Sequence, residues 1–204
     1  LHNSRLQVTG EYYLHIRQNL MALPGVGLEG IEEVHSHPMA LLQCVDFLDT
    51  HRWRLVETED TALSARRIAE RGIRNAAAIA GDLAAELFGL EIVAADIHSI
   101  RNNYTRFLVL RPDHQPIDER SDKASLCFKT DHRHGSLIRV LREMEDSTIN
   151  MTKLQSSPIP SEPWHYMFHV DMEFACMDDY NRVIERMRSV TSELHVYGVY
   201  RKGQ

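Results

Sequence analysis

The chain has 204 residues, of which 43% are hydrophobic and 25% charged, and its formal net charge is −6. This length can bury one or two sizeable cores, and the composition is ordinary for a soluble globular protein. The mild negative charge without a basic stripe argues against a nucleic-acid partner, and no apolar run approaches the length that crosses a membrane.

The first half of the chain alternates predicted strands and helices. Apolar runs and period-two alternation predict strands at residues 8–16, continuing through 19–23, and at 31–36, 53–58, 75–80, 91–94 and 107–110. Helices are predicted from Pro38, after the cap at Asp60-Thr61, and from Leu83 to Phe88 before Gly89. This order predicts an α/β lobe with a mostly parallel sheet.

A polar stretch with two prolines, residues 111–122, interrupts this pattern and predicts a linker. It divides the chain into segments 1–110 and 123–204. In the second segment the periodicities predict strands at 124–130, 150–154, 166–174 and 194–200, with helices from 135 to 144 and from 178 to 190. The order βαββαβ is that of the ferredoxin-like split unit.

The cysteines and histidines do not form a recognisable site. Three scattered cysteines without a C-x-x-C pair indicate reduced thiols in the cytoplasm rather than a disulfide framework. Close histidine pairs occur, but no H-E-x-x-H motif is present. His165 and His169 fall in a predicted strand, where residues four apart are roughly 13 Å apart, so no metal site is expected.

Residues 102–107, Asn-Asn-Tyr-Thr-Arg-Phe, place three kinds of chemistry where a strand begins. The Thr105 hydroxyl can donate a hydrogen bond, the Arg106 guanidinium can bind a carboxylate in a bidentate pair, and Phe107 offers an apolar wall. A capping threonine beside a surface arginine is the simpler interpretation of the first two. Plain core packing is an equal alternative for the phenylalanine.

Several stretches of segment 1–110 occur in the same order as in a known family. They are Gly10-Glu11-Tyr12-Tyr13-Leu14 with Asn19-Leu20, Ser36-His37-Pro38 with Gln43-Cys44, Asp60-Thr61-Ala62, Ala77-Ala78-Ile79-Ala80, Gly89-Leu90 and Asn103-Tyr104-Thr105-Arg106-Phe107. In these residues the segment resembles the C-terminal part of prephenate dehydratase. Segment 123–204 resembles the ACT regulatory domain that follows it in the same family.

The resemblance implies an α/β fold in two parts. The first is the second lobe of a two-lobed, periplasmic-binding-protein-like dehydratase domain, and the second is a βαββαβ ferredoxin-like ACT domain. The glycine-rich stretches of the family's N-terminal lobe are absent, and the chain does not begin with Met. We therefore expect part of the active site to come from residues before this sequence.

The resemblance also implies conversion of prephenate to phenylpyruvate in phenylalanine biosynthesis, with loss of water and carbon dioxide and without a metal or cofactor. It implies catalytic roles for Thr105, Ser36 and Gln43, and substrate contacts from Arg106, Phe107, Asn103 and Thr61. Expelling hydroxide is the difficult step, so a hydrogen-bond donor at that oxygen is the main requirement, and Thr105 is the candidate. Ser36 is otherwise an ordinary N-cap, and Thr61 has the same alternative.

Two nearby positions complete this comparison. His37 is expected to be a structural neighbour of the site rather than a general base. Met39 stands where the family often has Gln, which is a departure from the site pattern.

The C-terminal segment resembles a phenylalanine sensor through two motifs. The family's Gly-Ala-Leu is here Gly135-Ser136-Leu137, its Glu-Ser-Arg-Pro is Gln155-Ser156-Ser157-Pro158, and Asn150 is a further candidate effector contact. Serine in place of arginine at position 157 removes a five-donor fork, which weakens the expectation of inhibition by phenylalanine. Ordinary loop and turn chemistry is the alternative for all of these residues.

ACT units usually pair, so the resemblance implies a homodimer or homotetramer. The competing hypothesis for the whole chain is a non-catalytic amino-acid-sensing protein that uses the same fold. An intact Thr105-Arg106-Phe107 favours the enzyme, because a sensor has no need of a hydroxyl directed at a leaving group.

Overall fold

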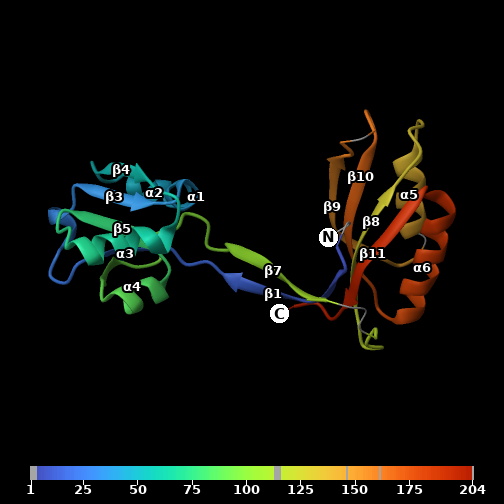
Figure 1. Cartoon of the computed structure of the whole chain (residues 1–204), viewed down its shortest axis with the longest axis horizontal. Coiled ribbons are helices and arrows are strands. Elements are labelled where there is room, and N and C mark those ends of the chain that lie inside the picture. The colour runs from blue at the N-terminus through green and yellow to red at the C-terminus, as the bar shows by residue number, and fades with distance from the viewer. Residues whose placement is uncertain (1–3, 113–115, 146, 161, 204) are drawn as a thin grey trace. The chain divides into compact units, whose positions relative to one another are not determined.

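The structure is a computed structural model that describes residues 4–112, 116–145, 147–160 and 162–203. It has a mixed α/β fold, and the chain forms two compact units (Figure 1). Leu14–Thr105 make up the first, here called the N-unit. Leu1–Tyr13 together with Arg106–Gln204 make up the second, here called the C-unit.

The N-unit is built on a five-stranded sheet in the order β4-β3-β5-β2-β6. Its strands are β2 (Asn19–Ala22), β3 (Glu33–Ser36), β4 (Arg54–Glu57), β5 (Ala76–Ala80) and β6 (Glu91–Ala94). β3 runs parallel to β4 and β5, whereas β2 runs antiparallel to β5 and β6. The sheet is therefore mixed but mostly parallel, as predicted: β4, β3, β5 and β6 run in one direction, and only β2, between β5 and β6, runs against them.

β2 corrects the prediction that residues 19–23 continue the first strand. β1 (Leu6–His15) ends at His15, and β2 begins at Asn19 in a different sheet with all four of its residues buried. A short apolar run has no alternation that could indicate which sheet it joins.

Helices cover both faces of the N-unit sheet. α3 (Thr61–Arg71) and α4 (Asp82–Phe88) pack on the face that carries Met21, and α1 (Pro38–Gln43) and α2 (Val45–Leu48) pack on the face that carries Leu20. Consecutive strand residues point to opposite faces, so Leu20 and Met21 belong to two separate cores. A single turn of 3-10 helix, η1 (Leu28–Gly30), precedes β3.

The helix ends follow local signals. Pro38 is the first residue of α1, the Asp60 carboxylate accepts a hydrogen bond from the Leu63 N–H at 2.9 Å, and Gly89 ends α4 in the left-handed conformation with φ 64°. The single helix predicted from Pro38 is two helices, because Cys44 adopts a non-helical conformation between them.

The C-unit has an antiparallel four-stranded sheet in the order β11-β8-β10-β9, with α5 and α6 packed on one face. Its elements are β8 (Lys123–Lys129), α5 (Ser136–Glu145), β9 (Asn150–Pro158), β10 (Tyr166–Glu173), α6 (Met177–Val190) and β11 (Glu193–Tyr200). Phe128, Val140 and Met187 are fully buried between the sheet and these helices. β9 runs four residues further than predicted, to Pro158.

Two long strands, β1 and β7 (Tyr104–Pro112), form a separate two-stranded sheet. Both strands cross the division between the units, at Tyr13-Leu14 and at Thr105-Arg106. Within the C-unit, Val8 of β1 is completely buried against Cys127 and Tyr197, on the sheet face opposite the helices. The Val8 backbone leaves no room for a side chain at Gly198 of β11.

The predicted linker is only partly described. β7 extends to Pro112, residues 113–115 lie outside the described residues, and β8 begins at Lys123. The division into 1–110, 111–122 and 123–204 therefore stays a prediction. Within the described ranges, no helix is both long enough and apolar enough to span a membrane.

A network of buried charges attaches β1 and β7 to the C-unit sheet. The Arg106 guanidinium donates from Nε to Glu11 at 2.5 Å, from one terminal nitrogen to Asp171, and from the other to the Tyr200 hydroxyl at 2.8 Å. The Glu11 side chain is completely buried, and that of Asp171 is 8% exposed. β7, β1 and β10 each supply one member of this ion-pair group.

A second cation balances the two carboxylates. Lys123 of β8 donates to Glu11 at 2.9 Å and to the Tyr13 hydroxyl at 3.3 Å. Ser125 donates to Asp171, and the Gly203 N–H donates to Glu11 at 3.1 Å. Buried charges are tolerated when each is paired and hydrogen-bonded, and both conditions hold here.

This pairing shifts the ionisation of Glu11. Burial by itself raises the pKa of its carboxyl group, but hydrogen bonds from Lys123 and the Gly203 N–H, together with the charge of Arg106, outweigh burial and hold the pKa below its ordinary value. Similarly, burial opposes the charge on Lys123, but Glu11 and Tyr13 raise its pKa.

A pH-dependent stability follows from Glu11. Its stabilising contribution is complete above the ordinary carboxyl pKa of about 4.3 and is lost as the pH falls through the lower folded value. We expect the melting temperature of the wild type to fall more steeply below about pH 4.3 than that of Glu11→Gln, which should already be less stable at pH 7. Differential scanning calorimetry from pH 7 to below about pH 4.3 measures the melting temperatures of both proteins.

Glu59→Gln is the control for this comparison. Its carboxylate also has a lowered pKa, because of the hydrogen bond from Arg67, but the pair is exposed and its loss should change the melting temperature little. Parallel curves of melting temperature against pH for the wild type and Glu11→Gln would contradict the expected role of Glu11.

Candidate functional site

The parallel strands of the N-unit place several predicted site residues at one edge of the sheet. β3 ends at Ser36 before α1, β4 is followed by Thr61 at the start of α3, and β5 is followed by α4. The carboxyl ends of parallel strands meet at the same edge, where ligands of α/β folds commonly bind. Asn19, at the start of the antiparallel β2, is opposite Ala80 and therefore joins the same edge.

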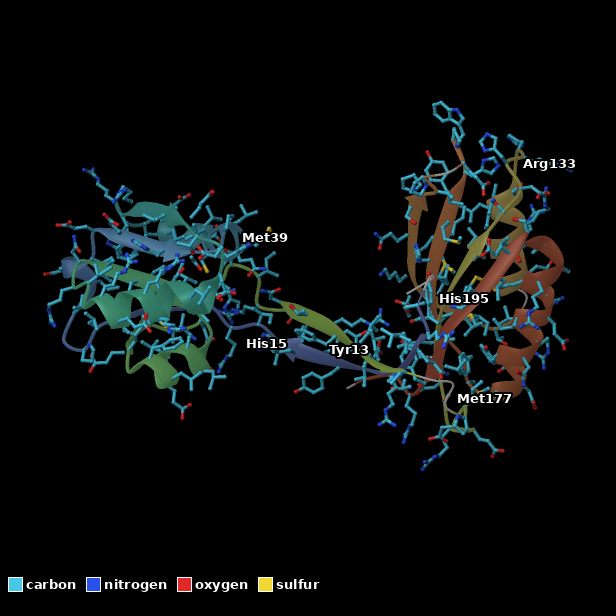
Figure 2. The ribbon with its side chains drawn as sticks, in the orientation of Figure 1. Tyr13, His15, Met39, Arg133, Met177 and His195 are labelled. Atoms are coloured by element: carbon cyan, nitrogen blue, oxygen red, sulfur yellow. The ribbon has the colours of Figure 1, made fainter. Side chains whose placement is uncertain are left out.

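Ser36 is held inside the sheet at this edge. Its side chain is fully buried, and its hydroxyl donates to the Ile79 carbonyl at 2.7 Å. The alternative of an ordinary N-cap was wrong, because His37 is the N-cap of α1 and accepts from the Met39 N–H at 3.2 Å. His37 thus has a local structural contact, and Met39 is exposed on α1 (Figure 2).

Gln43 holds the loop that leads toward Thr105. Its backbone carbonyl accepts from the Ser99 N–H at 2.8 Å, and its side-chain oxygen accepts from the Gln18 amide at 3.1 Å. The Gln18 carbonyl in turn accepts from the Ile97 N–H at 2.9 Å. The segment from 97 to 99 is therefore tied to two glutamines from distant parts of the chain.

The loop ends where β7 begins. The Asn103 carbonyl accepts from the Ile16 N–H at 2.8 Å, and the His15 and Tyr104 rings lie with their centroids 4.9 Å apart. Thr105 follows as an exposed residue of β7. Asn103 is half-buried beside it.

The other two predicted substrate contacts lie in different surroundings. Thr61 is the half-buried first residue of α3, next to the capping Asp60. Phe107 is 50% exposed, so the alternative of plain core packing was wrong. Its role as an apolar wall stays a prediction.

A cationic cavity of about 350 Å³ lies in the N-unit, lined by His15, Arg17, Asp96, His98 and Arg101. Arg17 is paired with Asp96 at 3.1 Å and with Asp82 at 3.7 Å. Among the described residues, no acidic side chain is paired with Arg101. This cavity was not predicted, although the polar run from Arg17 to Asn19 between two apolar stretches was a usable signal.

Arg106 is placed differently from a free anion clamp. All three guanidinium nitrogens have protein partners in the C-unit, as described above. Burial by itself lowers the pKa of the guanidinium, but the hydrogen bond to Asp171 and the surrounding negative charge raise it above its ordinary value. The group is therefore permanently charged, and each of its three nitrogens is bonded within the C-unit.

The predicted effector residues fall into two groups within the C-unit. Gly135, Ser136 and Leu137 line a cavity of about 550 Å³ together with Trp164 and Phe168. Arg133, in the loop before α5, also lines it (Figure 2). The remaining predicted contacts are on the edge strand β9, outside this cavity: Asn150, Gln155, Ser156 and Pro158.

The described residues contain no cluster of three or more His, Cys, Asp or Glu side chains that could hold a metal ion. The thiol of Cys44, next to Gln43, is completely buried, and burial raises its pKa to about 12. A thiol with so high a pKa is not a nucleophile near neutral pH. The chemistry available at the N-unit edge is therefore that of hydroxyl, amide, imidazole, guanidinium and carboxylate groups.

Known proteins resemble the chain over nearly its whole length. The bifunctional chorismate mutase/prephenate dehydratase of Neisseria gonorrhoeae is 38% identical over 201 residues, covering 96% of this chain and 54% of that protein. The solved prephenate dehydratase of Arthrobacter aurescens in complex with L-Phe superposes with a TM-score of 0.86 at 26% identity, covering 98% of this chain and 67% of that one. A structure described as a novel type of quorum quenching acylase superposes with a TM-score of 0.87 at 26% identity, covering 97% and 72%.

The chain spans about half the length of the curated relatives it matches. The family model of prephenate dehydratase matches residues 1–115, which include every strand and helix of the N-unit and the Thr105-Arg106-Phe107 string. The chain therefore belongs to the prephenate dehydratase family.

Proposed function

We propose that the protein carrying this chain converts prephenate to phenylpyruvate, with release of water and carbon dioxide. Family membership and the prephenate dehydratase activity in the names of its relatives support this reaction. The observation that carries the proposal is the exposed Thr105 at the end of a loop pinned by Gln18 and Gln43. A hydroxyl on such a support can be held in one place relative to a bound substrate.

The chemistry requires a donor at one oxygen. The bond from the ring to its hydroxyl group breaks, the ring carboxylate leaves as carbon dioxide, and the electron pair of the lost carbon–carbon bond completes the aromatic ring. Hydroxide is a poor leaving group, so a positioned hydrogen bond to the departing oxygen lowers the barrier. In this proposal Thr105 supplies that hydrogen bond, and Phe107 supplies an apolar neighbour for the carboxylate that is lost.

Ser36, Gln43, Thr61 and Asn103 take supporting roles. Ser36 and Gln43 have their polar atoms bonded to the sheet and to Gln18, so they hold the edge and the loop in place. Asn103 fixes the start of β7 through its carbonyl group. Thr61, at the N-terminus of α3, lies where backbone N–H groups favour an anionic substrate.

The remaining carboxylate of the substrate needs a cation. Arg101 lines the cationic cavity of the N-unit without an acidic partner among the described residues, whereas each of the three guanidinium nitrogens of Arg106 already has a protein partner. Arg101 is therefore our preferred carboxylate partner, in place of the predicted clamp at Arg106.

We also propose that the C-unit is an ACT domain that binds L-phenylalanine. The cavity beside Gly135, with Leu137, Trp164 and Phe168 in its walls, has the apolar and aromatic lining that suits a phenyl ring. A homologous prephenate dehydratase has been solved with L-Phe. Because Gln155 and Ser156 lie on the edge strand outside this cavity, a complete effector site would need a second copy of the chain, which fits the predicted homodimer or homotetramer.

One alternative function for the whole chain follows from the sequence. A non-catalytic amino-acid sensor would use the same C-unit cavity without turnover. The homologous structure described as an acylase illustrates that one fold supports different activities, so the assay must follow the reaction itself.

The cytoplasmic location stays a prediction from the cysteine pattern.

Replacement of Thr105 tests the proposed reaction in the protein at its natural length. Wild-type protein should form phenylpyruvate from prephenate, and the absorbance of phenylpyruvate measures the rate. Thr105→Ala should lower kcat about 10²- to 10³-fold with little change in KM, because the lost hydrogen bond forms mainly in the transition state. Thr105→Ser is the matched control and should keep most of the turnover. If Thr105→Ala turns over like the wild type, the assigned role is wrong.

Replacement of Arg101 tests the carboxylate contact. Arg101→Ala should raise KM for prephenate about tenfold or more and leave kcat nearly unchanged, because a carboxylate remote from the breaking bond is bound equally in ground and transition states. Arg66→Ala is the control, since this exposed arginine is paired with Glu70 on α3. Identical KM values for the two variants would remove Arg101 from the site.

Calorimetric titration of L-phenylalanine tests the effector site. We expect saturable binding and inhibition of turnover, and both should weaken in Leu137→Gln, which puts an amide into the apolar wall of the cavity. Leu87→Gln, an exposed position on α4, is the control. No heat of binding at millimolar phenylalanine would reject the effector while leaving the dehydratase proposal intact.

A further inference from the structure

Thr105 and Arg106 are adjacent in the chain but belong to different compact units. Thr105 is exposed at the end of the N-unit, whereas Arg106 is the first residue that returns to the C-unit. The side chain of Arg106 is 21% exposed and is bonded to Glu11, Asp171 and Tyr200. Whatever holds this guanidinium therefore also holds the backbone next to the proposed catalytic hydroxyl.

Arg106 could leave these partners only at a large cost. Its departure would strand the carboxylate of Asp171, which is 8% exposed, and would leave Glu11 with one buried cation instead of two. Breaking one side of a buried ion pair is strongly destabilising, because it leaves an uncompensated charge out of water. A substrate carboxylate that took the place of Glu11 or Asp171 on this arginine would strand that carboxylate, so the role of a substrate clamp fits the geometry poorly.

One acceptor of Arg106, Asp171, lies on an irregular part of the C-unit sheet. Ser125 of β8 is opposite Asp171 of β10 on one side and opposite Gly198 of β11 on the other. The register of the sheet shifts at both neighbours, between Asp171 and Met172 against β9, and between Val196 and Gly198 against β8. Such irregularities re-aim side chains, and here they flank the row that contains Asp171.

The same row is connected to the predicted effector strand. Asp171 pairs with Lys153 of β9, two residues before Gln155. A cavity of about 300 Å³ is lined by Arg106, Asp171 and Gln155 together. A shift of β9 relative to β10 would therefore be felt at the carboxylate that holds Arg106.

We propose that Arg106 is a positioning residue, which anchors the strand carrying Thr105 to Glu11 and Asp171, so that the state of the C-unit sheet sets the position of the Thr105 hydroxyl. This inference rests on the proposed dehydratase activity and adds the route by which the C-unit acts on it. The link is one backbone step long, from Arg106 to Thr105. An effector bound at β9 alters turnover through this link. It does so to the extent that the effector favours one arrangement of the contacts between Arg106, Glu11 and Asp171.

A double-mutant cycle on Arg106 and Asp171 tests this role in the protein at its natural length. Arg106→Lys and Asp171→Asn should each lower kcat about 10- to 100-fold, the size expected for a misplaced catalytic group, with KM changed less than about threefold. The double variant should be no worse than the poorer single variant, because the two residues act through one contact. In Asp171→Asn, phenylalanine should still bind by calorimetry but should inhibit the residual turnover less than in the wild type.

The control is Arg111→Lys, an exposed arginine on the same strand. It should match the wild type in kcat, KM and inhibition. If Asp171→Asn does not fold, Tyr200→Phe removes a single hydrogen bond from Arg106 and should give a smaller loss of kcat in the same direction. Circular dichroism and melting temperature establish which variants are folded.

The opposite pattern would overturn the inference. A direct clamp predicts that Arg106→Lys raises KM tenfold or more with kcat retained, while Asp171→Asn behaves like the wild type, and additive effects in the double variant would also reject the shared contact. If the wild type itself shows no prephenate turnover, the proposed function fails. The anchor is then judged by melting temperatures alone, where the two single losses should again be non-additive.

Discussion

The buried charge network of Glu11, Lys123, Arg106 and Asp171 is the interaction on which the arrangement of the C-unit depends. β1 and β7, which each run between the two units, are joined to the C-unit sheet through two cations and two carboxylates, and the carboxylates are at most 8% exposed. Such a group is stable only when it is complete, because removing one member leaves an uncompensated charge out of water. It therefore favours one position of these strands over any near alternative.

The candidate site of the N-unit depends on small side chains and hydrogen bonds. Its central strand β5 consists of four alanines and Ile79, all buried, and these small side chains let helices pack closely on both faces. The polar groups at the strand ends are then joined by backbone and amide hydrogen bonds around Gln18, Gln43 and the 97–99 loop. The resulting edge is rigid where it supports β7 and leaves Thr105 open to solvent.

The charge network of the C-unit and the hydrogen-bonded edge of the N-unit are connected by the peptide bond between Thr105 and Arg106. The N-unit presents the hydroxyl of Thr105, and the C-unit holds the next side chain along the chain. Under our proposal, the C-unit needs no long chain of contacts to affect the hydroxyl of Thr105. The proposal gives the neighbouring threonine and arginine different tasks, one in catalysis and one in positioning.

Much of the local structure was predictable from the sequence. The start of α1 at Pro38, the cap of α3 at Asp60 and the end of α4 at Gly89 each depend on a few adjacent residues, and the structure confirms them. The string from 103 to 107 indicated the family, which the family model confirms. In contrast, the capping role suggested for Ser36 belongs to His37, and the cavity of Arg17 and Arg101 was missed because its lining residues are far apart in the sequence.

The sequence by itself determined where helices and most strands begin and end, because backbone preferences, caps and apolar periodicity act over a few residues. Only the tertiary structure decided that β2 enters between β5 and β6, that Ser36 bonds to Ile79, and that Arg106 is taken by Glu11 and Asp171. Those outcomes depend on which distant groups remain unpaired once the sheets have formed. A donor such as a guanidinium carries no local signal of which carboxylate it will meet, since long-range packing selects the partner.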